Sequence, residues 1–249
     1  MIAKEELNIL WSLEQTAEKY EDRVAVSDVN QELTWKGLVK KAQVIGAELS
    51  KKVQPGNPIP VLLEKSSETL AVMLGIVYAG CFYVPVNPMN PAERLRKIME
   101  KLEPEVIISD EKGKEQLAAV GVGLEEKVIG PEILLPTTGT DLSEEQRSRL
   151  EQIQGQWKET DALYGIFTSG STGTPKAIVV SHGAVSRFVR HFTEIFEITS
   201  EDVIGNQAPF DFDVSVKDIY SSIMTGAQLV LIPKEYFSTC LLYTSDAAD

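Results

Sequence analysis

A run of small, hydroxylated and glycine residues ends in a lysine in the second half of the chain. Residues 168–176 have the sequence T-S-G-S-T-G-T-P-K. Glycine lets backbone N–H groups approach an anion without a Cβ clash, hydroxyl groups add donors, and Lys176 adds a positive charge. Such groups bind phosphates, so the run predicts nucleotide binding. The same composition is also typical of an ordinary flexible hairpin.

The spacing excludes a Walker A loop, which requires G-x-x-x-x-G-K-[ST] at the start of a helix. Here two residues separate Gly170 from Gly173, and Pro175 precedes the lysine. The flanking segments, Tyr164–Thr168 and Ala177–Ser181, are rich in β-branched and aromatic residues, which predicts strands. We therefore expect the loop to join strand to strand.

The loop resembles the signature loop of the adenylate-forming superfamily, which includes acyl- and aryl-CoA synthetases, luciferases and amino-acid adenylation domains. Three further blocks agree in order: Leu33–Trp35 (L-T-W), Ala79–Pro88 (A-G-C-F-Y-V-P-V-N-P) and Asn206–Ser215 (N-Q-A-P-F-D-F-D-V-S). The last block is most similar to the D-alanine–carrier-protein ligase branch. The resemblance covers nearly the whole chain to about residue 237.

The chain departs from the superfamily pattern at two positions. Ala177 follows the lysine where glycine is usual, and Asn87 replaces the usual aspartate. Neither change removes a phosphate donor.

The resemblance implies a function and a set of site residues. An amino acid and ATP would give aminoacyl-AMP and pyrophosphate, and the full enzyme would then load the acyl group onto a phosphopantetheinyl carrier protein. Asp213 would bind the α-ammonium group of the substrate, and Thr168 and Lys176 would assist the reaction at the α-phosphate. The residues implied to bind ATP are Thr168, Ser169, Gly170, Ser171, Thr172, Gly173 and Lys176.

Two of these residues, Asp213 and Lys176, also have a purely structural interpretation. Asp213 or Ser215 could be the N-cap of the helix that follows, and Lys176 could be a solvated hairpin lysine.

Asp211 is expected on the opposite side of an extended segment from Asp213. His182 and His191 fit helix ends or packing positions better than catalysis. We find no metal-ligand spacing, so Mg²⁺ would arrive with ATP.

Composition narrows the possible partners and location. A formal net charge of −13 disfavours nucleic acid and anionic membranes. Cys81 and Cys240 are too few and too far apart for a disulfide framework, and the first residues lack a signal-peptide core, which favours a cytoplasmic enzyme. Residues 70–86 carry no charge, but Gly75, Gly80 and Pro85 favour a buried helix and strand over a membrane span.

Hydrophobic periodicity predicts alternating helices and strands. The expected helices are Asn8–Tyr20, Trp35–Leu49, a helix ending at Tyr78, Pro91–Leu102, Ser143–Gln154, His182–Phe196 and Asp213–Met224. The expected strands are Pro60–Leu63, Phe82–Val86, Val106–Ser109, Tyr164–Thr168, Ala177–Ser181, Val203–Asn206 and Gln228–Ile232. This order predicts an α/β fold with helices layered over largely parallel β-sheets. By resemblance, it is the first half of the large N-terminal domain of the adenylate-forming fold.

Residues 1–239 are assigned to this partial AMP-binding domain, with residues 111–160 as a connecting excursion. Residues 240–249, C-L-L-Y-T-S-D-A-A-D, resemble the translation of a sequencing-adapter end and are excluded from the fold. We therefore expect the natural sequence to depart from the printed one near Thr239, and this fragment alone to be inactive. The rival interpretations are an acyl- or aryl-CoA synthetase, activation of a different amino acid, and a non-catalytic truncated product with at most weak ligand binding.

Overall fold

The computed structural model describes residues 5–121, 123–134, 141–168 and 175–238. Its helices are η1 (Glu5–Leu7), α1 (Ile9–Lys19), α2 (Trp35–Leu49), α3 (Ser67–Tyr78), α4 (Ala92–Leu102), α5 (Glu111–Val120), η2 (Glu125–Lys127), α6 (Pro131–Leu134), α7 (Glu144–Gly155), α8 (His182–Ile195), α9 (Val214–Thr225) and α10 (Glu235–Ser238). Its strands are β1 (Val24–Ser27), β2 (Glu32–Thr34), β3 (Pro58–Leu62), β4 (Phe82–Pro85), β5 (Ile107–Ser109), β6 (Val128–Ile129), β7 (Ala162–Thr168), β8 (Lys176–Ser181), β9 (Val203–Asn206) and β10 (Gln228–Leu231).

These strands form two sheets. The four-stranded sheet has the order β2-β1-β10-β9, and the six-stranded sheet has the order β6-β5-β3-β4-β7-β8. Neighbouring strands are parallel except at β1–β2 and β7–β8, which are antiparallel. The expected α/β fold with largely parallel sheets is thus confirmed.

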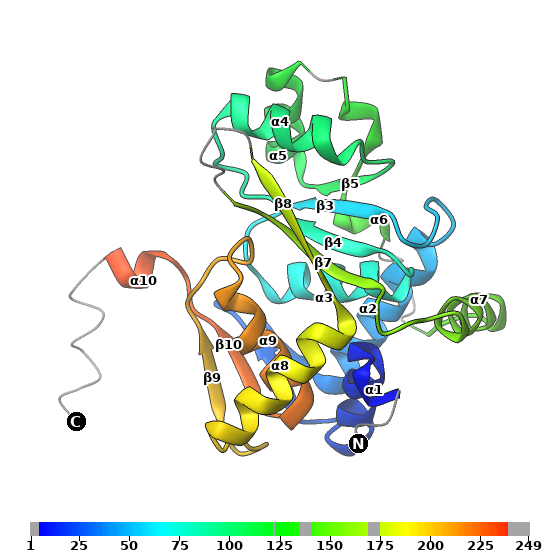
Figure 1. Cartoon of the computed structure of the whole chain (residues 1–249), viewed down its shortest axis with the longest axis vertical. Coiled ribbons are helices and arrows are strands. Elements are labelled where there is room, and N and C mark those ends of the chain that lie inside the picture. Colours follow the sequence, from blue (N-terminus) through cyan, green and yellow to red (C-terminus); the bar gives the residue numbers. More distant parts are fainter. Residues whose placement is uncertain (1–4, 122, 135–140, 169–174, 239–249) are drawn as a thin grey trace.

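Helices cover both faces of the six-stranded sheet. Figure 1 shows α4 and α5 above this sheet and α3 below it. Successive strand residues point to opposite faces, so Leu62 and Val84 pack with residues of α4 and α5, whereas Val61 and Tyr83 join the larger core with α2 and α3. A sheet covered on both faces presents its strand ends to ligands.

The backbones of helices α2 and α3 approach each other closely at two glycines. A Cβ atom placed on Gly46 would lie 2.5 Å from Cβ of Tyr78, and one placed on Gly75 would lie 2.5 Å from Cγ2 of Ile45. Only glycine therefore permits this approach. The charge-free run at 70–86 is the buried α3 followed by β4, as expected, and no helix in the described part of the chain is long and apolar enough to cross a membrane.

Three strands were not predicted from the sequence. β1 and β2 are short, and β1 pairs with β10 from the far end of the described chain. The segment expected to be a connection, 111–160, contains α5, α7 and also β6, which adds an edge strand to the six-stranded sheet. The adapter-like residues 240–249 lie outside the described residues.

Candidate active site

The predicted phosphate loop joins β7 to β8 in an antiparallel hairpin. In this hairpin Thr168 lies opposite Lys176, and Phe167 lies opposite Ala177. Both Thr168 and Lys176 are exposed. The loop therefore joins strand to strand, as expected, and its two described ends bring a hydroxyl-bearing and an ammonium-bearing residue together. The other implied phosphate-binding residues, Ser169, Gly170, Ser171, Thr172 and Gly173, lie outside the described residues.

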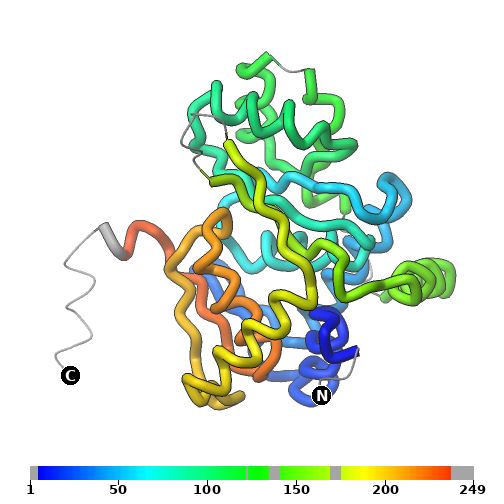
Figure 2. The backbone as a smooth tube through the Cα atoms, viewed as in Figure 1, coloured from blue at the N-terminus to red at the C-terminus, as the bar shows by residue number. Residues whose placement is uncertain are grey.

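The segment that carries Asp213 lies beside this hairpin. In Figure 2 the orange chain around the start of α9 lies next to the yellow-green hairpin strands, although the two are far apart in sequence. The Asp213 carboxylate helps to raise the pKa of Tyr164 on β7, where burial has the largest effect. Asp213 therefore lies close enough to β7 for its charge to act there.

Asp213 does not cap α9 through its side chain. It occupies the N-cap position with right-handed helical backbone angles, and its carboxylate accepts no capping hydrogen bond. The Ser215 hydroxyl donates to the Phe212 carbonyl at 2.7 Å, so it does not cap the helix either. Asp213 is exposed between Phe212 and Val214, which are 57% and 50% exposed. The carboxylate is thus free to bind a cation beside an apolar surface.

Tyrosine contacts fix α9 relative to the hairpin. The rings of Tyr83 and Tyr164 stack with centroids 6.0 Å apart, and the hydroxyl groups of Tyr83 and Tyr220 share a hydrogen bond of 2.7 Å. These buried residues come from β4, β7 and α9. The helix that begins after Asp213 is therefore linked to the strand that ends at Thr168.

Asp211 faces a different set of groups from Asp213. The expected extended segment is instead a turn, in which the Phe212 N–H donates to the Pro209 carbonyl at 3.1 Å. Burial raises the pKa of Asp211, and hydrogen bonds from its own backbone and from Asn87, with the charge of Arg94, partly offset this rise. Asn87 can donate to this carboxyl group, whereas the aspartate usual in the superfamily pattern would repel it.

Lys65 connects the ends of the two sheets, and sequence reasoning did not identify it. It follows β3, and its ammonium group donates to the carbonyls of Asn206, Gln207 and Ala208 at 2.9, 3.0 and 3.4 Å. Burial lowers the pKa of Lys65, and the Asp218 carboxylate opposes this effect. The residue thus binds three successive carbonyls of the segment that leads from β9 to Asp213.

The groups at the hairpin end have the charge and the hydrogen-bond donors that a phosphate group requires. Thr168 and Lys176 place a hydroxyl and a cation at the hairpin end, and Arg94 adds a second cation nearby. In the described part of the chain no three His, Cys, Asp or Glu side chains come together as a metal site. These groups are suited to bind an anion.

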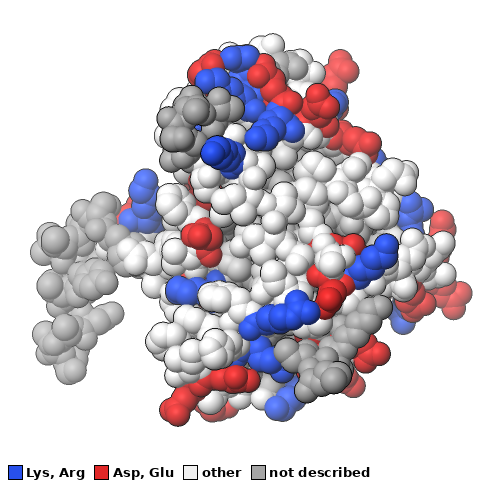
Figure 3. Space-filling model, in the orientation of Figure 1, with Lys and Arg blue, Asp and Glu red and all other residues white. Residues whose placement is uncertain are grey.

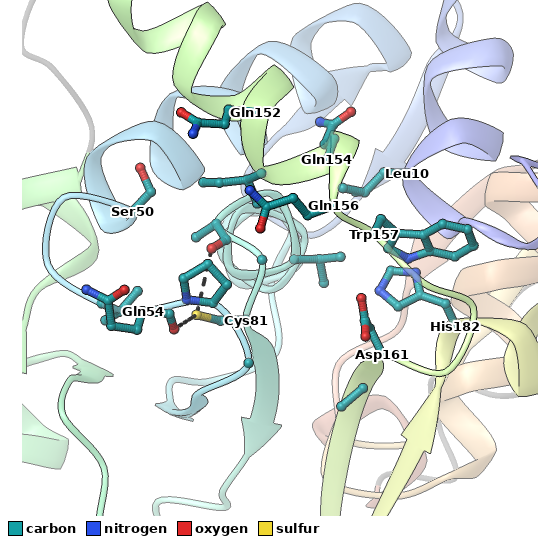
Figure 4. A pocket seen from close by; sticks show the side chains of 18 of the residues that line it. Leu10, Ser50, Gln54, Cys81, Gln152, Gln154, Gln156, Trp157, Asp161 and His182 are labelled. Atoms are coloured by element: carbon teal, nitrogen blue, oxygen red, sulfur yellow. Dashed lines mark hydrogen bonds between the residues drawn. The ribbon is translucent and has the colours of Figure 1, made fainter.

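A large cavity lies at the opposite, amino end of the six-stranded sheet. It has a volume of about 590 Å³ and is lined by residues that include Gly56, Gly80 and Ala162, at the starts of β3, β4 and β7. Figure 4 shows glutamine side chains along one side, with Trp157 and His182 adjacent to each other on another. This cavity is therefore separate from the hairpin end that carries Thr168 and Lys176.

Burial favours the neutral form of two side chains that line this cavity, Cys81 and His182. Burial raises the pKa of Cys81 to about 11, and its thiol donates to the Gln54 carbonyl at 3.3 Å. Burial lowers the pKa of His182 from 6.5 to about 3, and Nδ1 of this residue accepts a hydrogen bond from the Ile9 N–H at 3.4 Å. The prediction that His182 is a packing residue is confirmed, and the exposed His191 lies on α8.

Comparison with known proteins identifies the class. The AMP-binding enzyme family matches residues 13–243, and this chain belongs to that family. Tyrocidine synthase 1 of Brevibacillus parabrevis is 30% identical over 223 residues, which cover 89% of this chain and 20% of the synthase. Surfactin synthase subunit 1 of Bacillus subtilis (strain 168) is 29% identical over 93% of this chain and 6% of its own length. The chain thus spans a small part of these relatives.

Solved structures agree on the fold. The nonribosomal peptide synthetase FmoA3 matches with a TM-score of 0.77 and 25% identity, over 91% of this chain and 23% of FmoA3. VinN matches with a TM-score of 0.76 and 23% identity, over 90% of this chain and 56% of VinN. One of the matching FmoA3 structures is an AMPPNP-bound form. The fold of the described residues is therefore that of an adenylate-forming domain.

Proposed function

We propose that this chain is part of an enzyme that uses ATP to adenylate an amino acid. The observation that carries the proposal is the position of Asp213, an exposed carboxylate free of helix capping and close to β7. A carboxylate there can pair with an α-ammonium group while the nearby hairpin end binds the triphosphate. Membership of the AMP-binding family supports the use of ATP.

The reaction assigns a role to each group. The substrate carboxylate oxygen attacks the α-phosphorus of ATP, the bond to the bridging oxygen breaks, and pyrophosphate leaves with that electron pair. Lys176 and Thr168 stabilise the negative charge on the phosphates, and Asp213 orients the amino acid. Mg²⁺, bound with ATP, would neutralise further phosphate charge.

The resemblance in residues 206–220 favours D-alanine as the substrate and a phosphopantetheinyl carrier protein as the acceptor of the acyl group. The matches to peptide synthetases support an amino-acid substrate in general. We place the reaction in the cytoplasm because it consumes ATP.

The test is ATP–pyrophosphate exchange by the full-length protein with D-alanine, L-alanine and propionate, which lacks the amine. Wild type should prefer an amino acid. Asp213→Asn should weaken amino-acid activation by about 2–5 kcal/mol, because a bound cation loses its counter-charge. The matched control is Asp202→Asn, which alters a carboxylate that hydrogen-bonds Thr199 at the other end of β9 and should leave the preference unchanged.

Two results would replace the proposal. Preference of wild type for propionate, or normal use of amino acids by Asp213→Asn, would favour an acyl- or aryl-CoA synthetase, because those enzymes share the phosphate loop without needing an ammonium site.

A second candidate is a non-catalytic product. We expect the 249-residue chain alone to lack exchange activity, because it matches only 56% of VinN and 20% of tyrocidine synthase 1. Exchange at the rate of the full-length protein would contradict this expectation. Sequencing the source DNA through codon 240 distinguishes a continuing enzyme from a true stop.

A further inference from the structure

Helix α4 carries two cationic side chains toward the hairpin ends. Leu95, Ile98 and Met99 bury one side of the helix against the six-stranded sheet. Arg94 and Lys101 are seven residues apart, which is close to two helical turns, so they lie on one side of the helix. In Figure 3 blue side chains gather over α4 in the upper part of the view.

These two cations bind the two ends of the hairpin. Nη2 of Arg94 donates to the Phe167 carbonyl at 3.1 Å, and Nζ of Lys101 donates to the Pro175 carbonyl at 3.4 Å. Phe167 immediately precedes Thr168, and Pro175 immediately precedes Lys176. One helix therefore contacts the backbone next to both described phosphate-binding residues.

The other cations of α4 have a different role. Arg96 pairs with Glu93 and Glu100 at 2.8 and 2.5 Å, and Lys97 pairs with Glu93 at 3.4 Å. These pairs remain within the helix and contribute little to a distant site. The same helix thus offers a matched arginine and a matched lysine that do not bind the hairpin.

The position of Arg94 also indicates a tertiary role. It lies in the first turn of α4, where the helix dipole disfavours a positive charge. Its contact with the Phe167 carbonyl and the nearby Asp211 carboxylate compensate for this placement. Arg94 therefore connects the hairpin to the segment that leads to Asp213.

We propose that Arg94 and Lys101 are positioning residues that fix the two ends of the β7–β8 hairpin and so orient Thr168 and Lys176 toward the triphosphate of ATP. This inference rests on the proposed function for its link to catalysis. Its main effect is on nucleotide binding, because Arg94 and Lys101 bind the hairpin backbone itself, whereas the segment that leads to Asp213 is also bound by Lys65.

The test compares Arg94→Gln and Lys101→Met with the controls Arg96→Gln and Lys97→Met in the full-length protein. Binding of AMPPNP is measured by calorimetry, and KM values are measured by exchange. Arg94→Gln should weaken AMPPNP binding and raise the ATP KM about tenfold, because a hydrogen bond from a charged donor is lost. Lys101→Met should change AMPPNP affinity and the ATP KM only about threefold, because interactions of an exposed lysine are weaker. Arg94→Lys should recover part of the loss, and the amino-acid KM should stay constant in Lys101→Met.

The controls should change AMPPNP binding less than about twofold. Equal effects in the controls, or unchanged AMPPNP binding in both Arg94→Gln and Lys101→Met, would overturn the inference. If Arg94→Gln does not fold, AMPPNP binding by Lys101→Met and Arg94→Lys tests the inference instead. Wild type that binds AMPPNP without exchange would refute the proposed function alone, and wild type that does not bind AMPPNP would refute both.

Discussion

The two ends of the six-stranded sheet differ in the side chains that they present. The amino end has a cavity of about 590 Å³, yet burial keeps the Cys81 thiol protonated and the His182 imidazole neutral. The carboxyl end presents exposed Thr168, Lys176 and Asp213. The comparison teaches that a cavity and a set of exposed polar groups need not coincide, and we propose that the chemistry takes place at the carboxyl end.

A large effect is expected when the phosphate-binding groups proposed at the carboxyl end are removed. In the full-length protein, Lys176→Ala and Thr168→Ala should each reduce ATP–pyrophosphate exchange about 10- to 150-fold, because each removes a donor to phosphate worth about 1.5–3 kcal/mol. Circular dichroism should show an unchanged fold. If both variants keep wild-type exchange kinetics, the hairpin is an ordinary turn and the contrast between the two ends disappears.

At the amino end, we expect His182 to affect the free energy of unfolding and not the rate of the reaction. The pKa of His182 is about 3 in the folded chain and ordinarily 6.5. The unfolded chain therefore binds an extra proton between these values, and stability falls as pH falls through this window. Between pH 7.5 and 5.0 this linkage should cost wild type about 2 kcal/mol.

Urea denaturation at both pH values measures this linkage. His182→Gln should show a pH dependence smaller by that amount. His191→Gln, which changes an exposed histidine on the same helix, should retain the wild-type dependence. Equal pH dependence in wild type and His182→Gln would mean that the imidazole is not held neutral by burial.

A smaller effect is expected at Lys65, between the two sheets. Lys65→Met removes three hydrogen bonds to the carbonyls at 206–208 and should raise the amino-acid KM about tenfold, because the segment leading to Asp213 loses its support. The ATP KM should change little. The control Lys112→Met removes only an exposed pair with Glu64, and an equal effect there would refute a positioning role for Lys65.

The smallest effect should come from the cavity itself. Cys81→Ala should change exchange rates by less than about twofold, because a protonated and buried thiol is not a nucleophile. Exchange assays of the full-length variant measure this directly. A large loss of activity with a normal fold would show that the amino end takes part in catalysis.

Local sequence signals predicted much of the fold. The helix expected at Trp35–Leu49 and the strand expected at Val203–Asn206 agree with α2 and β9, because periodicity and turn residues act over short distances. β1 was missed since it has four residues and pairs with distant β10. Short strands of this kind depend on partners that local sequence does not reveal.

The site was predicted less completely than the fold. Thr168, Lys176 and Asp213 belong to recognisable blocks, whereas Lys65 and Arg94 bind backbone carbonyls, which every residue possesses and no motif records. One signal was available for Arg94, since a cation in the first turn of a helix opposes the helix dipole. The Asp211 carboxyl group interacts with Asn87 and Arg94, which come from another part of the chain.

The pairing of β1 with β10 has a consequence for how the chain folds during synthesis. Val26 pairs with Leu229, so the four-stranded sheet cannot close until nearly all of the described chain has left the ribosome. The six-stranded sheet is complete once β8 ends at Ser181. Pairings between distant segments form slowly, and domains emerging from the ribosome fold from the N-terminal side first. We therefore expect the nascent chain to acquire its hairpin before Asp213 is fixed in place.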